Sequence, residues 1–251
     1  MVVSKGVEIA GVLITLPTWA PYVAVAVSGL AGAVDAAKRG FDVIGILSIA
    51  IVSGVGGLLL RDIVLQDGTP VVLTKPGFLA TAGAVAVFGF FFAGLISRVN
   101  GALVVLEGLA IGFLCTVGAT PALKLGLGYS SAVLTGVVTA VGGIVLRDIL
   151  SGTAPRIVRP GSFVAIAALA STSVFVALLA IKTNIVLAQF IAMAVALGLR
   201  IGAHWLGWGT RPANELADSV WGFWYRGKRK VTDLTVKPGD KSFSDSDQRS
   251  S

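Results

Sequence analysis

Charged side chains are scarce in this chain of 251 residues. Asp, Glu, Lys and Arg together make up only 13% of it, against roughly 25% in an average soluble domain. A soluble protein of this length needs more charge to cover its surface, so the composition excludes an ordinary soluble enzyme and a disordered chain. A single cysteine excludes a disulfide scaffold and a site built from several cysteines. The one histidine, His204, lacks the partners of a metal centre.

Long apolar runs are what the chain has instead. Hydrophobic residues make up 55% of it, and a transmembrane helix needs about 20 mainly apolar residues in succession. Because the runs are continuous, without the alternation of a strand, we expect an all-α integral membrane protein with seven transmembrane helices. The predicted spans are Ala20–Ala37, Val43–Ile63, Gly77–Ser97, Ala102–Ala119, Tyr129–Leu150, Gly161–Ile181 and Ile185–Leu206.

The sequence matches itself when it is shifted by 86 residues without a gap. Positions 32–63 and 118–149 share 13 identities in 32 aligned positions. The shared motif reads Gly-Gly-x-x-x-Arg-Asp, at 56–62 and again at 142–148. Each copy holds three predicted helices, an odd number, so the second copy enters the membrane from the opposite side. The pattern predicts two inverted three-helix repeats plus a seventh helix, an architecture typical of transporters and some channels.

The repeat also predicts how the chain is organised. We expect a lead-in at 1–19, a first repeat at 20–97, a second repeat at 98–181, a seventh helix at 182–210 and a basic, partly disordered cytosolic tail at 211–251.

The repeated glycines predict the position of the functional site. Two consecutive glycines weaken a helix by about 1 kcal/mol each relative to Ala and permit a kink or an unwound turn. Carbonyls freed there can replace the water around a cation, and hydroxyls about one turn earlier add oxygen ligands. The predicted pore elements are therefore Ser53, Gly56, Gly57, Thr139, Gly142 and Gly143. The alternative is that the glycines only let two helices pack closely.

An Arg-Asp pair follows the glycines in each copy by about one helical turn. Charges inside a membrane are costly, so they pair with one another or face water. The symmetry of the repeat suggests cross-pairs, Arg61 with Asp148 and Arg147 with Asp62. Such pairs either lock the two repeats together or act directly in permeation, and the sequence leaves both roles open.

Two further acids fall within apolar runs. Asp35 lies near a helix end, where we expect a solvated carboxylate. Glu107 is deeper. The alternative for both acids is that they line a path or plug the mouths of a pore. Cys115 is expected to serve packing, and close-packing helix faces are expected at Gly108, Gly112, Gly198 and Gly202.

The formal charge of +7 indicates membrane topology rather than a nucleic-acid partner. The basic residues lie at the ends of apolar runs and in the tail, where Arg226, Lys228, Arg229 and Lys230 cluster beside aromatic residues. Because cytoplasmic loops carry an excess of Lys and Arg, we expect the N-terminus outside and the C-terminus in the cytosol.

The doubled motif, followed in each copy by a Gly and then a Pro, resembles the trimeric intracellular cation (TRIC) channel family in its prokaryotic branch, some members of which are named glycine transporters. The resemblance covers roughly Thr18 to Leu206. It implies a homotrimer in a prokaryotic plasma (inner) membrane, in which helices two and five, kinked at their glycines, line a pore in each protomer for K⁺ and, less selectively, Na⁺. The family pattern often has a third glycine, where this chain has Leu58 and Ile144, and a small residue at the position of Asp35.

We therefore expect a passive, K⁺-permeable channel that is not an enzyme. No cofactor is expected beyond the permeating K⁺ (and Na⁺), the expected partners are membrane lipids and two further copies of the chain, and no nucleic acid is expected. The alternative is a secondary transporter of glycine or a similar small solute, because the N-termini of half-helices bind carboxylates. A membrane enzyme is disfavoured because no paired catalytic motif is visible.

Overall fold

The computed structural model of the chain describes residues 8–9, 12–13, 16–96, 98–99, 101–158 and 163–206. The chain divides into two compact units, Met1–Thr210 and Arg211–Ser251. The second unit, and with it the predicted basic tail, lies outside the described residues.

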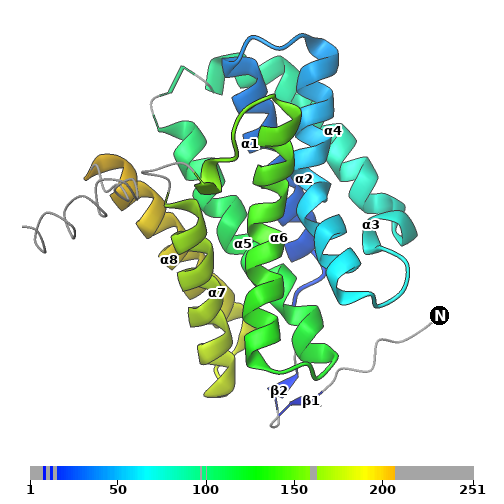
Figure 1. Cartoon of the computed structure of the whole chain (residues 1–251), viewed down its shortest axis with the longest axis vertical. Coiled ribbons are helices and arrows are strands. Elements are labelled where there is room, and N and C mark those ends of the chain that lie inside the picture. The colour runs from blue at the N-terminus through cyan, green and yellow to red at the C-terminus, as the bar shows by residue number, and fades with distance from the viewer. Residues whose placement is uncertain are drawn as a thin grey trace, which may run out of the picture. The chain divides into compact units, whose positions relative to one another are not determined.

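Seven long helices form the described part of the first unit (Figure 1). They are α1 (Ala20–Lys38), α2 (Val43–Leu65), α4 (Pro76–Ile96), α5 (Ala102–Lys124), α6 (Tyr129–Leu150), α7 (Val164–Ala180) and α8 (Ile185–Trp205). The short elements are an antiparallel hairpin of β1 (Glu8–Ile9) and β2 (Val12–Leu13), the one-turn helix α3 (Val71–Thr74) and the 3₁₀ turn η1 (Arg156–Val158).

The apolar runs of the sequence correspond to these helices. Six of them are long and apolar enough to cross a membrane, and α7, with 17 residues, is the shorter seventh. The chain is thus an all-α, multi-pass membrane protein, as its composition predicts. The predicted spans agree with the helices to within a few residues, and the largest difference is at the end of α5.

Helix α5 continues past a proline to Lys124, although the sequence predicts that it ends at Ala119. Pro121 has no N–H to donate to the carbonyl of Val117, one turn earlier, and such an unpaired carbonyl usually weakens a helix. Here Nη1 of Arg61, on α2, donates to the Val117 oxygen at 3.2 Å. The contact between the two helices satisfies the carbonyl that the proline leaves open, so α5 keeps its last turn.

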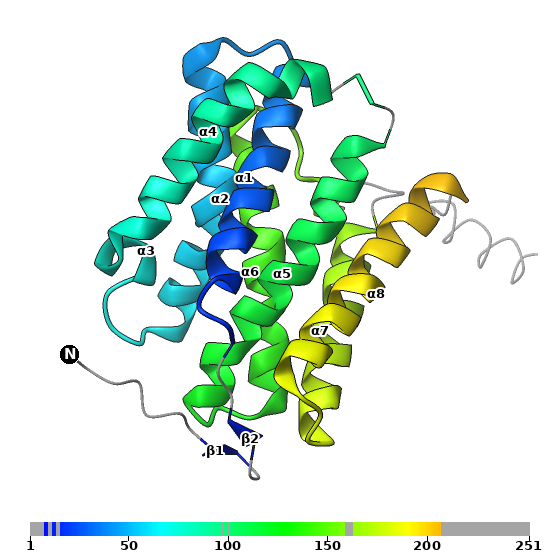
Figure 2. The same ribbon diagram turned by 180° about the vertical axis from the view of Figure 1, so that it is seen from behind.

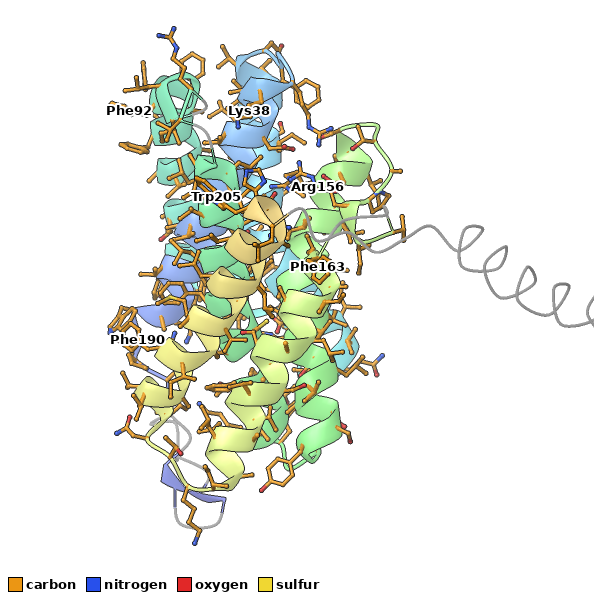
Figure 3. The ribbon with its side chains drawn as sticks, turned by 90° about the vertical axis from the view of Figure 1, so that its left-hand side faces the viewer. Lys38, Phe92, Arg156, Phe163, Phe190 and Trp205 are labelled. Carbon is orange, nitrogen blue, oxygen red and sulfur yellow. The ribbon has the colours of Figure 1, made fainter. Side chains whose placement is uncertain are left out.

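Helices α5 and α6 lie in the middle of the described bundle. Figures 1 and 2 show α1, α2 and α4 on one side of them and α7 and α8 on the other. Burial follows this arrangement, because 67% of the apolar stretch of α5 is buried, against 22% for α4 and 28% for α8. The outer helices present Phe92, Phe190 and Trp205 to their surroundings (Figure 3). Lipid tails are as apolar as these side chains, so their exposure is consistent with a bundle that crosses a membrane.

Small residues let α5 approach α8. A Cβ added to Gly112 would lie 2.6 Å from the Cα of Met193, and one on Gly108 would lie 3.1 Å from the Cα of Leu197. Only glycine fits such distances, so the prediction of a close-packing face on α5 is confirmed. The corresponding prediction for Gly198 is not confirmed within the single chain, because a Cβ there would meet nothing within 4 Å.

Candidate functional site

The two Gly-Gly pairs meet where α2 crosses α6. A Cβ on Gly57 would collide with the carbonyl oxygen of Thr139, and one on Gly143 would lie 2.6 Å from the carbonyl oxygen of Ser53. The partner glycines, Gly56 and Gly142, are covered by leucines of the opposite helix. The backbones of α2 and α6 therefore touch at the repeated motif, which places the predicted pore elements together in one contact.

The unwound turn that the sequence predicts does not form at either pair. Both α2 and α6 are α-helical through their glycines, so the carbonyls there remain within the helices. The hydroxyls are also engaged, because Ser53 and Ser28 each donate to the other's carbonyl oxygen, at 2.8 and 2.7 Å, and Thr139 donates to the carbonyl of Thr135 at 2.6 Å. Close helix packing, the alternative weighed from the sequence, is the role that the glycines have in this structure.

Residues at matching positions of the repeat make matching contacts. A Cβ on Gly32 would lie 2.5 Å from the Cβ of Ser53, and one on Gly118 would lie 2.5 Å from the Cβ of Thr139. In each pair the second copy is 86 residues further along the chain. The first two helices of each copy thus pack through the same pairing of a glycine with a hydroxyl residue.

The two motif aspartates also share one role. Oδ2 of Asp62 accepts from the backbone N–H of Val71 at 2.8 Å, and Oδ2 of Asp148 accepts from the backbone N–H of Arg156 at 2.8 Å. Both donors directly follow a proline and begin a short helix, α3 in one copy and η1 in the other. Each aspartate therefore fixes the connection that leaves its own helix.

The predicted cross-pairs between the repeats are wrong. Arg61 contacts its neighbour Asp62, with Nη2 2.6 Å and Nε 2.8 Å from Oδ1. Arg147 contacts Glu107, Asp35 and its own neighbour Asp148. The reason is the crossing geometry. Helices α2 and α6 run antiparallel through their glycines, so the Arg-Asp pairs, one turn further on, lie on opposite sides of the crossing.

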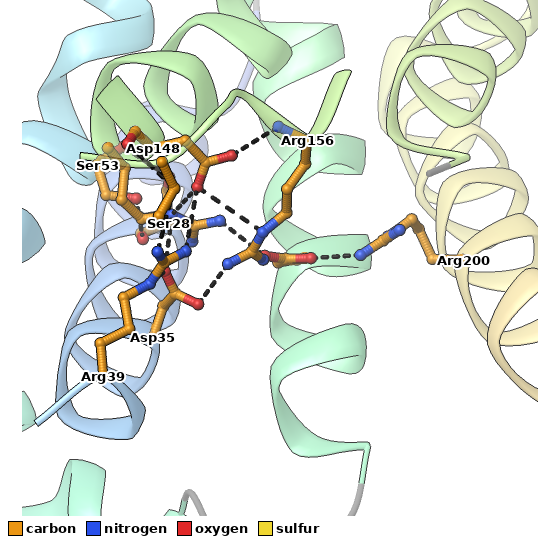
Figure 4. A network of polar contacts seen from close by, with 10 residues as sticks. Ser28, Asp35, Arg39, Ser53, Asp148, Arg156 and Arg200 are labelled. Carbon is orange, nitrogen blue, oxygen red and sulfur yellow. Dashed lines mark hydrogen bonds and ion pairs between the residues drawn. The ribbon is translucent and has the colours of Figure 1, made fainter. Parts of the chain in front are cut away.

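Arg147 is the centre of a buried network of charges at one end of the bundle. Figure 4 shows this network, with Asp35, Arg39, Asp148, Arg156 and Arg200 labelled. The side chain is 0% exposed, and its Nη2 donates to Oε1 of Glu107 at 2.8 Å. Arg156 and Arg200 also donate to Glu107, so this carboxylate binds three guanidinium groups. Arg39 donates from Nε to Asp35 at 2.9 Å. The members come from α1, α5, α6, α8 and the connection that follows α6.

Asp35 is part of this network, which corrects the prediction of a solvated helix end. Its residue is 4% exposed, and it pairs with Arg39, Arg147 and Arg156. Asp148 completes the set, with its Oδ1 between 3.6 and 3.7 Å from a nitrogen of the same three arginines.

The network contains four arginines, Arg39, Arg147, Arg156 and Arg200, and three carboxylates, so its formal charge is +1. Burial by itself lowers the pKa of Arg156, which lies outside the spanning helices. The neighbouring carboxylates of Glu107, Asp35 and Asp148 outweigh it and hold that pKa above its ordinary value. The guanidinium therefore stays charged, and the network does not titrate through it near neutral pH.

The other end of the bundle carries a cavity of about 530 Å³ instead of a network. Arg61, Lys75 and Lys124 line it, together with apolar side chains such as Leu58 and Phe78. The groups of acids, His and Cys needed to hold a metal ion are absent from the described ranges. His204 is exposed at the end of α8, and Cys115 is buried, with its Sγ 3.4 Å from the carbonyl oxygen of Ala168.

Sequence reasoning missed three arginines of the network. The spacing of four residues between Asp35 and Arg39 is a signal that could have found one of them, because side chains at i and i+4 meet on a helix. Arg200 interrupts an apolar helix and so needs a partner, which is a weaker signal. Arg156 lies in a connection, and nothing in the sequence ties it to Glu107, which is 49 residues away.

Comparison with known proteins places this geometry in a family. A family model described as Glycine transporter matches residues 18–94 and 104–180. The second stretch begins 86 residues after the first, the offset of the internal repeat. Both halves of the chain therefore match the same family model.

Two solved structures share the fold. The TRIC trimeric intracellular cation channel orthologue from Rhodobacter sphaeroides gives a TM-score of 0.68 at 32% identity, over 74% of this chain and 96% of that one. A structure described as the basis for conductance through TRIC cation channels gives a TM-score of 0.67 at 26% identity, over 79% of this chain and 97% of that one.

Curated bacterial relatives are also similar. A UPF0126 membrane protein of Deinococcus radiodurans is 30% identical over 139 residues, which cover 55% of this chain and 65% of that protein. The UPF0126 inner membrane protein YadS of Escherichia coli K12 is 30% identical over 142 residues, which cover 56% of this chain and 69% of that protein. The match thus spans about two thirds of these relatives' own length.

Proposed function

We propose that this chain, which belongs to the family described as Glycine transporter, is a channel through which monovalent cations, K⁺ above all, cross a prokaryotic plasma membrane passively. The observation that carries the proposal is the likeness to the Rhodobacter sphaeroides cation channel, which is 32% identical and is matched over 96% of its length. The buried polar and charged residues of the bundle support it, because such residues inside a membrane mark ion and substrate pathways.

The ion path of the proposal follows the crossing of α2 and α6. Ser53, Gly56 and Gly57 lie on one helix there, and Thr139, Gly142 and Gly143 on the other. In the present structure the two backbones touch at these residues, and in the proposal this arrangement is the closed state of the path. Ions pass when the helices separate at the crossing, which exposes the hydroxyls and backbone carbonyls of both motifs to water. The Arg-Asp pairs flank this opening, one on each side.

The assembly and topology of the proposal follow the repeat and the loop charges. In the proposal the two three-helix copies are inverted with respect to each other, and α8 stands outside them. Arg39 and Arg156 lie at the end of the bundle where α8 terminates, and an excess of basic residues is typical of the cytoplasmic side. The C-terminus is therefore cytosolic and the N-terminus outside. In the proposal three copies associate as a homotrimer, like the relative that is described as trimeric, and each protomer has its own pore.

A secondary transporter of glycine or a similar small solute is the second candidate. The description of the matching family model favours it, because that description names glycine transport. A transporter and a channel differ in how flux depends on concentration, since a transporter saturates when its binding sites are full.

Flux into proteoliposomes separates the two functions. Purified full-length protein is reconstituted, and uptake of radioactive rubidium, which replaces K⁺, is compared with uptake of radioactive glycine. The channel proposal expects rubidium uptake that rises without saturation and glycine uptake no greater than in empty liposomes. Saturable glycine uptake without rubidium flux would replace the channel by the transporter.

A further inference from the structure

We propose that the cavity at the C-terminal end of α2 is a binding site for a phosphate group, either a free phosphate or the headgroup of an anionic phospholipid. The inference concerns what the cavity binds and not what crosses the membrane, although Arg61 both lines the cavity and flanks the opening proposed for the ions.

The cavity is built around a buried arginine. Arg61 is 4% exposed, and it is held in place by Asp62 on one side and by the carbonyl oxygen of Val117 on the other. Lys75, which is exposed, and Lys124, which is half-buried, line the same space. Three cations of two chemical kinds thus surround a volume of about 530 Å³.

The repeat explains why this site lacks its own carboxylates. Arg147, the counterpart of Arg61, contacts Glu107 and Asp35. Shifting these acids by 86 positions leads from Glu107 back to Pro21 and from Asp35 forward to Pro121. Both prolines line the cavity. Where one end of the bundle has two carboxylates facing its motif arginine, the other end has two prolines that line the cavity.

The charges of the cavity specify an anion. The described residues that line the cavity include no Asp or Glu. The adjacent Asp62 carries one negative charge and so offsets only one of the three cations. Its oxygens bind Arg61 and the N–H of Val71. Three positive charges and one negative charge leave a local charge of +2, which a phosphate group offsets. Arginine and lysine are both regular phosphate ligands, the first through its planar fork and the second as a point charge.

The shape of the cavity accommodates more than the phosphate alone. Leu58, Phe78 and Val117 add apolar walls, and Tyr22 and Thr120 add hydroxyl groups. A phosphate with an attached glycerol or acyl portion satisfies both kinds of surface. Inorganic phosphate uses only the charged part, so the two sources of the same chemistry are separable by experiment.

The test measures binding of two probes to the purified full-length protein in a neutral detergent at constant ionic strength. The probes are radioactive inorganic phosphate and fluorescent phosphatidylglycerol, with zwitterionic phosphatidylcholine for comparison. One variant combines Lys75→Gln with Lys124→Gln. A second, Pro121→Asp, restores at this end the carboxylate that Asp35 provides at the other. Lys182→Gln is the matched control, because Lys182 is exposed in the connection between α7 and α8 and does not line the cavity.

The proposal expects each cavity variant to bind the anionic probe at least about tenfold more weakly than the natural chain. A tenfold loss corresponds to about 1.4 kcal/mol, the size of a single charge-assisted contact. The control should bind as the natural chain does, and gel filtration and thermal unfolding should report folded protein for every variant. Competition by inorganic phosphate identifies a free-phosphate site, and binding of phosphatidylglycerol alone identifies a headgroup site. Equal binding of both phospholipids, undiminished binding by folded Pro121→Asp, or no binding of either anionic probe would overturn the proposal.

Discussion

Glu107 shows how much a single side chain determines in this protein. It is 1% exposed and binds Arg147, Arg156 and Arg200, which come from three different parts of the chain. Removing one partner of a buried ion pair is costly because it leaves the other charge buried without compensation. Here one carboxylate compensates three guanidinium groups, so its loss raises the charge of the network from +1 to +2.

The substitution Glu107→Gln tests this dependence, because it keeps the shape of the side chain and removes its charge. We expect the free energy of unfolding to fall by about 3–5 kcal/mol, the usual cost of breaking a buried pair. Denaturant unfolding in detergent, followed by circular dichroism, measures it. Asp67→Asn is the control, since Asp67 is an exposed acid in a connection. Equal stability of the two variants would contradict the structural role of Glu107.

At the scale of elements, the contact between α2 and α6 depends on the absence of side chains. The motif glycines bring the two backbones together. The alanine, serine and threonine residues around them are small enough to fit between helices at this short distance. Gly57 has the tightest surroundings of the four, because a Cβ there would lie 2.1 Å from the carbonyl oxygen of Thr139. Backbone atoms on an opposing helix move only if the whole helix moves.

Gly57→Ala is therefore expected to destabilise the protein, although alanine favours a helix over glycine by about 1 kcal/mol. Overpacking at a close contact costs about 1–3 kcal/mol, so the sign of the effect is set by packing and not by helix propensity. Gly83→Ala, on α4, is the comparison, because its Cβ would meet nothing within 4 Å. Thermal unfolding of both variants should show a lower midpoint for Gly57→Ala only. A midpoint that rises in both would mean that the contact is not tight.

The elements were largely predictable because apolar runs of membrane length leave few alternatives. Tyr129–Leu150 was predicted to the residue. The short elements were not predicted, since α3 and η1 have four and three residues, too few for a periodic pattern. The extension of α5 beyond Pro121 was not predictable either, because it depends on a hydrogen bond from Arg61, 60 residues earlier in the chain.

The candidate site was predictable only in part, for a related reason. The repeated motif identified the residues where α2 and α6 meet, because an ordered pattern at a fixed offset is visible in the sequence alone. The partners of the motif arginines were not visible in the sequence, because tertiary packing brings Glu107 and Asp35, which lie on other helices, into contact with Arg147. Symmetry suggested cross-pairs, and the antiparallel crossing of the two helices separated them.

At the scale of the whole molecule, the two ends of the bundle differ in the surroundings of the motif arginine. At one end Arg147 pairs with carboxylates of the chain, and at the other end Arg61 lines a cationic cavity. If the C-terminus is cytosolic, the balanced network lies at the cytosolic end and the cavity faces outward. The topology therefore decides which side supplies the phosphate group.

A reporter fused after Ser251 tests the topology. We expect alkaline phosphatase, which needs the oxidising side of the membrane, to be inactive there, and green fluorescent protein to be fluorescent. The same pair of reporters placed before Met1 should give the opposite result. Active phosphatase at the C-terminal position would reverse the orientation and place the cavity on the cytosolic side.

Ion conduction is the central claim, and the reversal potential in a planar bilayer tests it most directly. The purified full-length protein is placed between two KCl solutions of different concentration, and the voltage at zero current is measured. The account predicts discrete single-channel currents that reverse close to the equilibrium potential of K⁺, because the pore passes cations and excludes chloride. Silent bilayers from protein that accumulates glycine in liposomes, or currents that reverse at the chloride potential, would contradict it.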